Sequence, residues 1–246
     1  MAGTIHIGTS GWSYKHWRGR FYPEKTAPRD YLAFYAQHFH TTEINTSFYR
    51  LPKRETIKHW ISVVEKTFLF CPKISRYITH IKKLNDPKDI LPKFFDLFEP
   101  VKKHLGPILV QLPPSLSFDK ERATEFYQAL KKYKGYHFAL EARHESWFVK
   151  ESITLLKKQG IAFVIAESGN RRPYIEEITD QNIYLRLHGP SGYASSYSDK
   201  ILRTFARKVT NWKKDGHTVW IFFNNDGKAH AVFNAQRLME MTGSAS

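Results

Sequence analysis

Acidic and imidazole side chains that can transfer protons close several apolar runs of this sequence. Glu141 and Glu167 each stand near the end of such a run, and His188 ends another. Carboxyl and imidazole groups act as general acids and bases when their surroundings bring their pKa values near the working pH. Two carboxylates that flank a bond also suit glycoside hydrolysis. We therefore predict Glu141, Glu167 and His188 as candidate catalytic groups.

Cationic side chains stand at the ends of further apolar runs. Lys73, Arg143 and Arg186 could together hold a phosphate or a carboxylate, because guanidinium groups offer paired donors that match these anions. The structural alternative is a network in which Glu141 neutralises Arg143 and Glu167 neutralises Arg186. The position of the charges at run ends, rather than within the runs, favours an anion-binding site.

A divalent metal site built from Glu141, Glu167 and His188 is a weaker alternative. The sequence has no His-x-His or His-Glu-x-x-His spacing, and adjacent arginines would repel a cation. Its single cysteine, Cys71, excludes a cysteine metal cluster. We predict no cofactor and no metal.

The elements that must position these groups can be read from the hydrophobic pattern. Apolar runs cover residues 5–10, 42–45, 68–73, 107–111, 137–143, 161–167, 183–188 and 219–225. Amphipathic stretches predict helices over residues 30–39, 55–66, 91–105, 119–132, 147–159, 200–215 and 229–241. Eight strands separated by helices predict an α/β protein with a (β/α)8 TIM barrel, whose active site lies at the carboxyl ends of the strands. Residues 171–180 are too few for a full helix, so the crossover between strands six and seven is predicted to be degenerate, and a three-layer doubly wound sheet remains the alternative.

Strand alternation selects the side chains that point into the mouth of such a barrel. Residues two apart on a strand share a face, as Glu43 does with Asn45 and Glu141 with Arg143. The predicted inward set is Asn45, Lys73, Gln111, Glu141, Arg143, Glu167, Arg186, His188 and one of Asn224 or Asn225.

Aromatic residues are concentrated in the predicted loops beside this mouth. Trp12, Tyr14, Tyr49 and Trp147 could stack on bases or sugars next to basic residues. The alternative is that these rings pack over the end of the barrel.

Composition limits the classes of partner. The 246 residues carry a formal net charge of +15, which favours an anionic small molecule or a nucleic acid as partner, although paired lysines on predicted helices could simply form solvated faces. The sequence has no apolar stretch long enough to cross a membrane and no visible secretory signal. We expect a cytoplasmic protein with residues 1–246 in one domain, no membrane association and no obligate protein partner.

Motifs along nearly the whole chain are similar to those of the YecE-like family, a widespread group of TIM-barrel proteins catalogued as a domain of unknown function. The matching segments are residues 7–14, 17–19, 21–23, 43–52, 78–80, 110–114, 140–144, 184–189 and 223–225. Two positions depart from the family pattern: Asn45-Thr-Ser-Phe-Tyr49 reverses the usual hydroxyl order, and Glu167 stands where an aspartate is common. The resemblance implies the barrel fold and no particular reaction.

These observations lead to a functional prediction with two alternatives. We predict an enzyme, of a phosphoesterase-like or nuclease-like hydrolase type, that acts on an anionic substrate at the mouth of the barrel. A non-catalytic nucleic-acid-binding protein and a carbohydrate-active hydrolase are the alternatives. The candidate substrate-binding residues, with Arg50 added from the second family motif, are Trp12, Tyr14, Asn45, Tyr49, Arg50, Lys73, Gln111, Arg143, Trp147, Arg186, Asn224 and Asn225.

Overall fold

Parallel strands alternate with helices along the chain in the computed structural model, which describes residues 3–169 and 173–244. The strands are β1 (Ile5–Thr9), β2 (Thr41–Ile44), β3 (Leu69–Pro72), β4 (Ile108–Gln111), β5 (Phe138–Glu141), β6 (Ala162–Phe163), β7 (Ile165–Glu167), β8 (Asn182–Leu187) and β9 (Thr218–Phe223). The α-helices are α1 (Tyr31–Tyr35), α2 (Thr46–Tyr49), α3 (Arg54–Ser62), α4 (Pro87–Ile90), α5 (Pro92–Phe98), α6 (Lys120–Leu130), α7 (Lys150–Gln159), α8 (Asp199–Lys214) and α9 (His230–Thr242).

The strands form two hydrogen-bonded sheets that meet at both edges. One sheet has six strands in the order β3-β2-β1-β9-β8-β7, and the other has three in the order β4-β5-β6. Isolated parallel bridges, Phe70 with Leu105 and Lys73 with Leu109, link the β3 segment to the β4 segment. At the other edge Val164 alone separates β6 from β7, and its amide donates to the Leu140 carbonyl at 2.9 Å.

The predicted α/β class with parallel strands is confirmed. One continuous eight-stranded barrel is not confirmed, because the hydrogen bonds divide the strands into sheets of six and three. The predicted strand over residues 161–167 is divided at Val164 into β6 and β7. No helix forms over residues 173–180, in agreement with the short crossover expected there, while residues 170–172 lie outside the described part of the chain.

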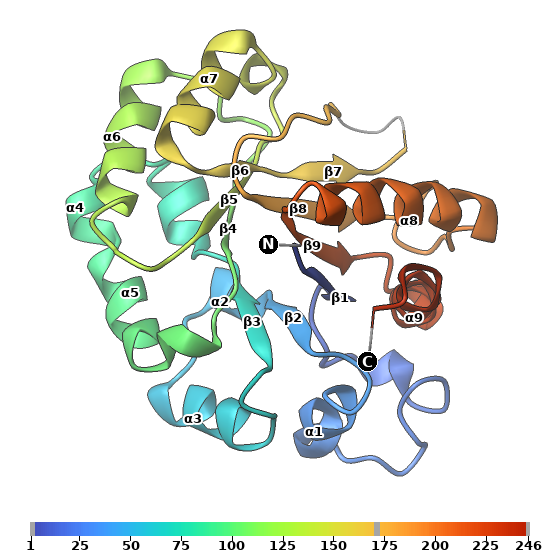
Figure 1. The fold of residues 1–246 in the computed structure, drawn as a ribbon. Coiled ribbons are helices and arrows are strands. Elements are labelled where there is room, and N and C mark those ends of the chain that lie inside the picture. Colours follow the sequence, from blue (N-terminus) through green and yellow to red (C-terminus); the bar gives the residue numbers. More distant parts are fainter. Residues whose placement is uncertain (1–2, 170–172, 245–246) are drawn as a thin grey trace.

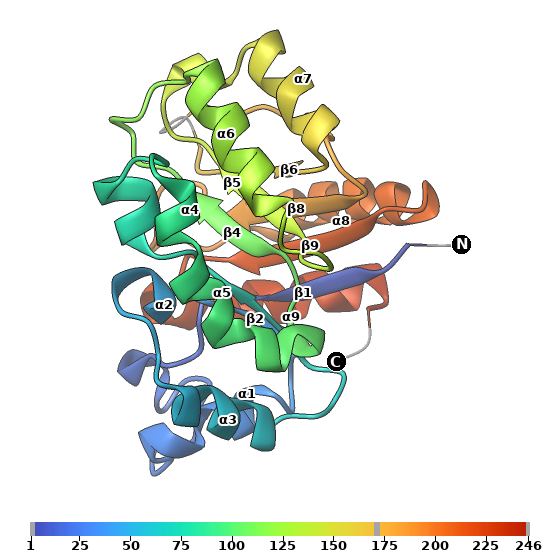
Figure 2. The same cartoon turned by 90° about the vertical axis from the view of Figure 1, so that its left-hand side faces the viewer.

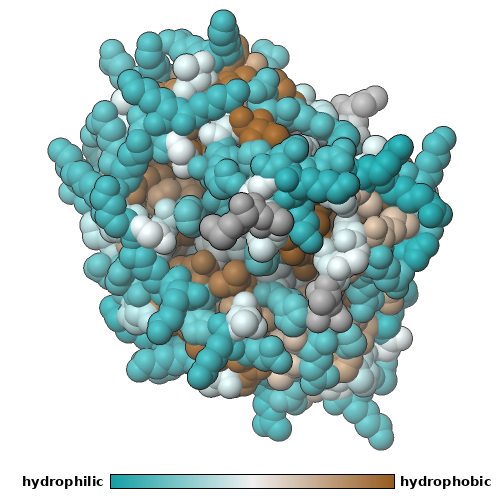
Figure 3. Space-filling model, viewed as in Figure 1, coloured by the Kyte–Doolittle hydropathy of each residue, from teal (hydrophilic) through white to brown (hydrophobic). Residues whose placement is uncertain are grey.

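Helices surround the strands on their outer side (Figure 1). In both views α4, α5, α6 and α7 lie outside β4, β5 and β6, while α8 and α9 lie beside β8 and β9 (Figures 1 and 2). The amphipathic pattern explains this packing: α8 buries Leu202, Phe205, Ala206 and Val209, which share one face of the helix. Figure 3 shows hydrophilic side chains over most of one face of the molecule, with hydrophobic atoms in the gaps between them.

The helix expected over residues 91–105 is broken into shorter pieces. Helix α5 begins at Pro92, and a 3-10 segment, Glu99–His104, begins one residue before Pro100. Proline lacks an amide hydrogen and clashes with the preceding turn, so it is tolerated at the start of a helix and interrupts its interior. In contrast, α7 ends as predicted at Gly160, whose φ of 63° is in the left-handed region that glycine adopts without strain.

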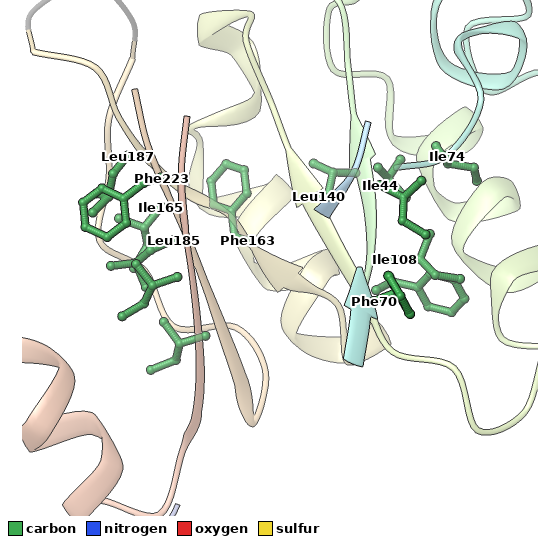
Figure 4. Close-up of a cluster of buried hydrophobic side chains, with 14 of the residues drawn as sticks. Ile44, Phe70, Ile74, Ile108, Leu140, Phe163, Ile165, Leu185, Leu187 and Phe223 are labelled. Carbon is green, nitrogen blue, oxygen red and sulfur yellow. The ribbon is translucent and has the colours of Figure 1, made fainter. Parts of the chain in front are cut away.

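Alternate residues of each strand pack into two separate cores. The larger core joins strand residues such as Ile108 and Leu140 to the helices (Figure 4). The smaller core consists of strand residues from the opposite face: Cys71, Leu109, Ala139, Ala162, Val164, Ala166, Tyr184, Trp220 and Phe222. We call the strand face that carries this smaller core the inner face. The inner-face side chains at the carboxyl ends of the strands lie beyond this apolar core, whereas His6 and Asn182 contact Trp220 near the amino ends.

No helix in the described part of the chain combines the length and the apolar character that a membrane span requires.

Candidate functional site

A cavity of about 990 Å³ lies beside the carboxyl ends of β2, β3, β4 and β8. The structure brings together nine of the predicted site residues in its wall: Trp12, Tyr14, Asn45, Tyr49, Lys73, Gln111, Arg143, Arg186 and Asn224. The first loop supplies Trp12 and Tyr14, α2 supplies Tyr49, and the other residues lie at or just beyond the carboxyl ends of their strands on the inner face. The cavity is therefore the place where the predicted anion-binding residues meet.

Arg186 is the central cation of this site and is fully buried. Its Nε and Nη2 atoms donate to the two carboxylate oxygens of Glu43 at 2.8 Å and 2.9 Å, and Nη1 donates to Glu141 Oε2 at 2.6 Å. Burial lowers the pKa of Arg186, but the carboxylates of Glu43 and Glu141 outweigh burial and raise that pKa above its ordinary value. Arg186 therefore holds a permanent charge that two acids share.

Glu141 is held as a carboxylate by the cations around it. Arg143 Nε donates to Glu141 Oε1 at 3.0 Å, on the side opposite the bond from Arg186. Burial raises the pKa of Glu141, but the charges of Arg186 and Arg143 outweigh it and lower that pKa well below its ordinary value. Such a carboxylate is a weak base at neutral pH, so its geometry suits a fixed charge better than the proton transfer predicted for it.

The predicted place of Glu167 in the inward set is wrong, and so is its pairing with Arg186 in the structural alternative. Residues 162, 164 and 166 belong to the inner face, so Glu167 points to the opposite face of β7. There its carboxylate accepts hydrogen bonds from the Tyr197 hydroxyl and from the Gly169 amide. Glu43, rather than Glu167, is the second acid partner of Arg186.

The same alternation separates the two asparagines after β9. Asn224 lines the cavity, and its amide lies 3.0 Å from His188 Nδ1. Asn225 is buried on the other side, where its Nδ2 donates to the Ser195 carbonyl and to Asn234. His188 is fully buried beneath the cavity wall, with Nε2 3.9 Å from Glu141 Oε1. Of the three predicted catalytic groups, Glu141 and His188 thus lie together and Glu167 lies apart from them.

The three residues of the alternative metal site therefore do not converge. Within residues 3–169 and 173–244, the His, Cys, Asp and Glu side chains form no group of three or more that could hold a metal ion.

Besides Asn225, two predicted binding residues do not line the cavity. Trp147 is fully buried, its Nε1 donates to the Leu116 carbonyl at 2.8 Å, and its ring packs against Phe118. Trp147 is therefore a packing residue, as the structural alternative for the aromatic loops proposed. Arg50 is exposed, directly follows α2 and does not line the cavity.

The other aromatic residues divide between packing and the cavity rim. Trp12 lines the cavity and packs edge-on against Trp60, with ring centroids 5.3 Å apart. The Tyr14 hydroxyl donates to the Ser10 carbonyl at 2.6 Å, which fixes the ring in the wall. Tyr49 is 72% exposed at the rim, and Tyr193, from the loop after β8, is also exposed there. The rim therefore presents two aromatic rings to anything that enters.

A single neutral oxygen joins the three cations of the site. Gln111 Oε1 accepts hydrogen bonds from Lys73 Nζ at 3.1 Å, from Arg143 Nη2 at 2.9 Å and from Arg186 Nη1 at 3.1 Å. We call Lys73, Arg143 and Arg186 the cation cluster. A carbonyl oxygen has two lone pairs, so three donors exceed its ordinary capacity. The cluster gathers positive charge around an atom that carries no compensating charge.

Lys73 is the member of the cation cluster that can lose its proton. Its ammonium lies 3.8 Å from the centre of the Phe48 ring, and the residue is 8% exposed. Burial, and next the charge of Arg186, lower the pKa of Lys73 to about 7, against the opposing effect of Glu141 and Glu43. At neutral pH this lysine therefore exists in both charged and uncharged forms.

Sequence reasoning missed several residues of the site. Strand alternation could have identified Glu43, which shares a strand face with Asn45. It could also have identified Tyr184, which shares a strand face with Arg186 and whose hydroxyl donates to Glu43 Oε1 at 2.8 Å. The remaining missed residues include Phe48, Trp60, Arg76, His80 and Asp226, which line the cavity from helices and loops. Strand alternation carries no signal for such residues.

Two of the missed residues from helices and loops have shifted pKa values. Burial, and next the charge of Lys73, lower the pKa of His80 to about 4, so this imidazole is neutral near pH 7. Burial raises the pKa of Asp226, while nearby His16 lowers it in part. Asp226 is therefore closer to the range of a general acid than Glu141 is.

Comparisons with known proteins agree on one relationship. A family model described as "Protein of unknown function DUF72" matches residues 6–246. The UPF0759 protein YecE of Escherichia coli K12 is 30% identical to this chain over 185 residues. The match covers 72% of this chain and 65% of YecE, so it spans less than two thirds of that protein. The crystal structure of a DUF72 family protein from Thermotoga maritima superposes with a TM-score of 0.88 at 28% identity, covering 98% of this chain and all of that one. A DUF72 family protein from Enterococcus faecalis shares the fold, with a TM-score of 0.85 at 20% identity, covering 99% and 97% of the two chains.

Proposed function

Since the chain belongs to the DUF72 family of proteins of unknown function, we propose from the cavity itself that it is an enzyme acting on an anionic, phosphorylated substrate. The observation that carries this proposal is the convergence of Lys73, Arg143 and Arg186 on Gln111 Oε1. When Lys73 is protonated, these three cations face the two carboxylates of Glu43 and Glu141 within the described part of the cluster. An entering anion would supply the missing negative charge.

Arg143 is the member of the cluster that is best placed to bind the anion. Its side chain is 20% exposed, whereas the Arg186 side chain is 2% exposed and already donates to both acids. Glu141 holds Arg143 through Nε and Gln111 holds it through Nη2, so the guanidinium plane is fixed at the cavity wall. A fixed guanidinium loses little conformational entropy when it binds a phosphate.

We propose a hydrolase of the phosphoesterase or nuclease type as the reaction class. In this proposal Glu141 orients the arginines, and Asp226, which lines the cavity and has a raised pKa, serves as proton donor. Carbohydrate hydrolysis by Glu141 and Glu167 has no support, because these acids lie on opposite faces of their strands.

A single-stranded nucleic acid is the second candidate ligand. It is favoured by Tyr49 and Tyr193, which are exposed on the cavity rim beside the cation cluster. Exposed aromatic rings next to basic groups provide stacking surfaces for bases.

We also propose that residues 1–246 form one domain, a closed (β/α)8 barrel with its mouth at this cavity. The bridges between the β3 and β4 segments and the near-continuity of β6 with β7 support closure at both sheet edges. The two separate cores, one of strand residues alone, also support it.

Calorimetric titration tests the function. Inorganic phosphate and a short single-stranded oligonucleotide should bind the wild-type protein at low ionic strength. Binding should weaken about tenfold or more in Arg143→Gln, as expected for a lost charge-assisted hydrogen bond. Arg207→Gln is the matched control, because Arg207 is exposed on α8 away from the cavity. Equal binding by Arg143→Gln and the control, or no binding by the wild type, would contradict the proposal. Phosphoesterase and nuclease assays of the same variants then test the reaction class.

A further inference from the structure

We propose that Lys73 is an amine nucleophile that forms an imine with the carbonyl group of a phosphorylated aldehyde or ketone bound in the cavity. This inference rests on the proposed anion-binding function and specifies its substrate class. The side chain lines the cavity, and its Nζ donates to Gln111 Oε1 at 3.1 Å.

The backbone of Lys73 is fixed on three sides. Its amide donates to the Ile44 carbonyl at 3.1 Å, and its carbonyl accepts from the Ser47 hydroxyl at 2.6 Å. A parallel bridge to Leu109 joins it to the β4 segment. Because the main chain is held by its neighbours, the amine has a defined position at the cavity wall, as a nucleophile requires.

The surroundings of the amine favour its uncharged form. Among the described residues no carboxylate lies within ion-pair distance of Nζ, because Arg186 and Arg143 already hold the nearby acids. Arg186 and Arg143 repel the ammonium form from other elements, Glu43 and Glu141 oppose this effect in part, and the neighbouring His80 is neutral near pH 7. Arginine does not deprotonate in proteins, so the cluster can relieve its repulsion only through the lysine.

The aromatic wall adds desolvation to this repulsion. The Phe48 ring lies 3.8 Å from the amine and excludes water from that side, while its face attracts the ammonium form. A pKa of about 7 for Lys73, lowered first by burial and then by Arg186, agrees with this geometry. Desolvation next to another cation is a known way to activate a lysine as a nucleophile.

The proposed step balances without an oxidant or reductant. The lone pair of neutral Nζ attacks the carbonyl carbon, a C–N bond forms as the C=O π bond opens, and the oxygen takes one of the two amine protons to give a carbinolamine. The C–O bond then breaks, the hydroxyl group leaves as water with the second amine proton, and a C=N bond forms. Arg143 would hold the phosphate of the substrate during both steps, since its side chain reaches the cavity surface.

Reductive trapping tests the proposal. The wild-type protein is incubated with glyceraldehyde 3-phosphate and sodium cyanoborohydride, and the adduct is located by peptide mass mapping. One reduced adduct should form at Lys73, and its yield should rise between about pH 6 and about pH 8 as the amine deprotonates. Unphosphorylated glyceraldehyde should label Lys73 much less. Adducts confined to exposed lysines would overturn the proposal, and this result does not depend on the folding of any variant.

Matched lysine variants separate this proposal from the anion site. Lys73→Arg keeps the charge and should lose the adduct, whereas Lys66→Arg, at an exposed position, should keep it. An adduct of equal yield in folded Lys73→Arg would contradict the proposal. Titration of the wild type with inorganic phosphate separates failure of the imine proposal from failure of the anion site. If phosphate binds but no adduct forms at Lys73, the imine proposal alone is refuted. If phosphate does not bind, the anion site is refuted as well.

Discussion

Nζ of Lys73 donates a hydrogen bond to Oε1 of Gln111, 3.1 Å away, and the same oxygen also accepts from two arginines. A neutral amide thus stands where an ion-pair network would place a carboxylate. When Lys73 is protonated, the three cations outnumber the carboxylates of Glu43 and Glu141, and this relationship leads to the first prediction.

Gln111→Glu should weaken the binding of inorganic phosphate by about tenfold or more. The new carboxylate would neutralise the cation cluster and repel the entering anion. Gln128→Glu, which adds the same charge at an exposed position of α6, should leave binding nearly unchanged. Calorimetric titration of the two variants measures the difference, and equal affinities would show that the cluster does not bind the anion.

Lys73→Met should increase the free energy of unfolding more at neutral pH than at high pH. The folded protein has a Lys73 pKa of about 7, below the ordinary value of 10.5, so the unfolded chain binds more protons between these pH values. Wild-type stability therefore rises with pH across that interval, on the order of a few kcal/mol from this group, and the methionine variant lacks the rise. Urea denaturation at about pH 7 and about pH 10 checks this. If Lys73→Met raises the free energy of unfolding equally at both pH values, Lys73 is not a buried lysine whose charged form is repelled by the arginines.

Glu141→Gln should destabilise the protein by about 3–5 kcal/mol at neutral pH, because it removes the carboxylate shared by two arginines. The pKa of Glu141 lies below its ordinary value of 4.5, so its stabilisation is complete above about pH 5 and is lost as the pH falls. The variant should therefore show a shallower loss of stability in acid than the wild type. Glu125→Gln, exposed on α6, serves as control. If the free energy of unfolding falls equally steeply with decreasing pH in the wild type and in Glu141→Gln, the prediction is wrong.

Glu167→Gln should change stability but not phosphate binding. Its carboxylate fixes the Tyr197 hydroxyl and the Gly169 amide on the face of β7 that points away from the cavity. A weakened charge-assisted hydrogen bond costs about 1–3 kcal/mol. Thermal denaturation and phosphate titration of the same preparation measure both effects. Loss of phosphate binding with unchanged stability would place Glu167 in the site after all.

Tyr49→Ala should weaken the binding of a single-stranded oligonucleotide and leave stability nearly unchanged. The ring is 72% exposed at the rim, so it contributes little to the core, and one stacked base is worth about 1–3 kcal/mol. Tyr174→Ala is the matched control, because it removes an exposed ring that does not line the cavity. If the two variants bind the oligonucleotide equally well, Tyr49 is not a stacking surface.

Strand alternation predicted much of the site because it is a local property. Lys73, Gln111, Arg143 and Arg186 occupy the inner face as expected, since a strand turns each successive side chain to the opposite side. The rule failed at Glu167 because residues 161–166 are apolar on both faces. Such a run indicates a buried strand but not which of its faces is the inner one.

By itself, then, the sequence determined the α/β class, the order of the elements and the kinds of charge at the strand ends. The tertiary structure decided which charges meet: Arg186 pairs with Glu43 across 143 positions of the chain, rather than with Glu167. It also decided that Gln111 faces three cations, and that burial, and next the charge of Arg186, lower the pKa of Lys73 to about 7. These outcomes depend on how strands pack beside one another and on how far each charge is removed from water. Neither quantity is a property of neighbouring residues in the sequence.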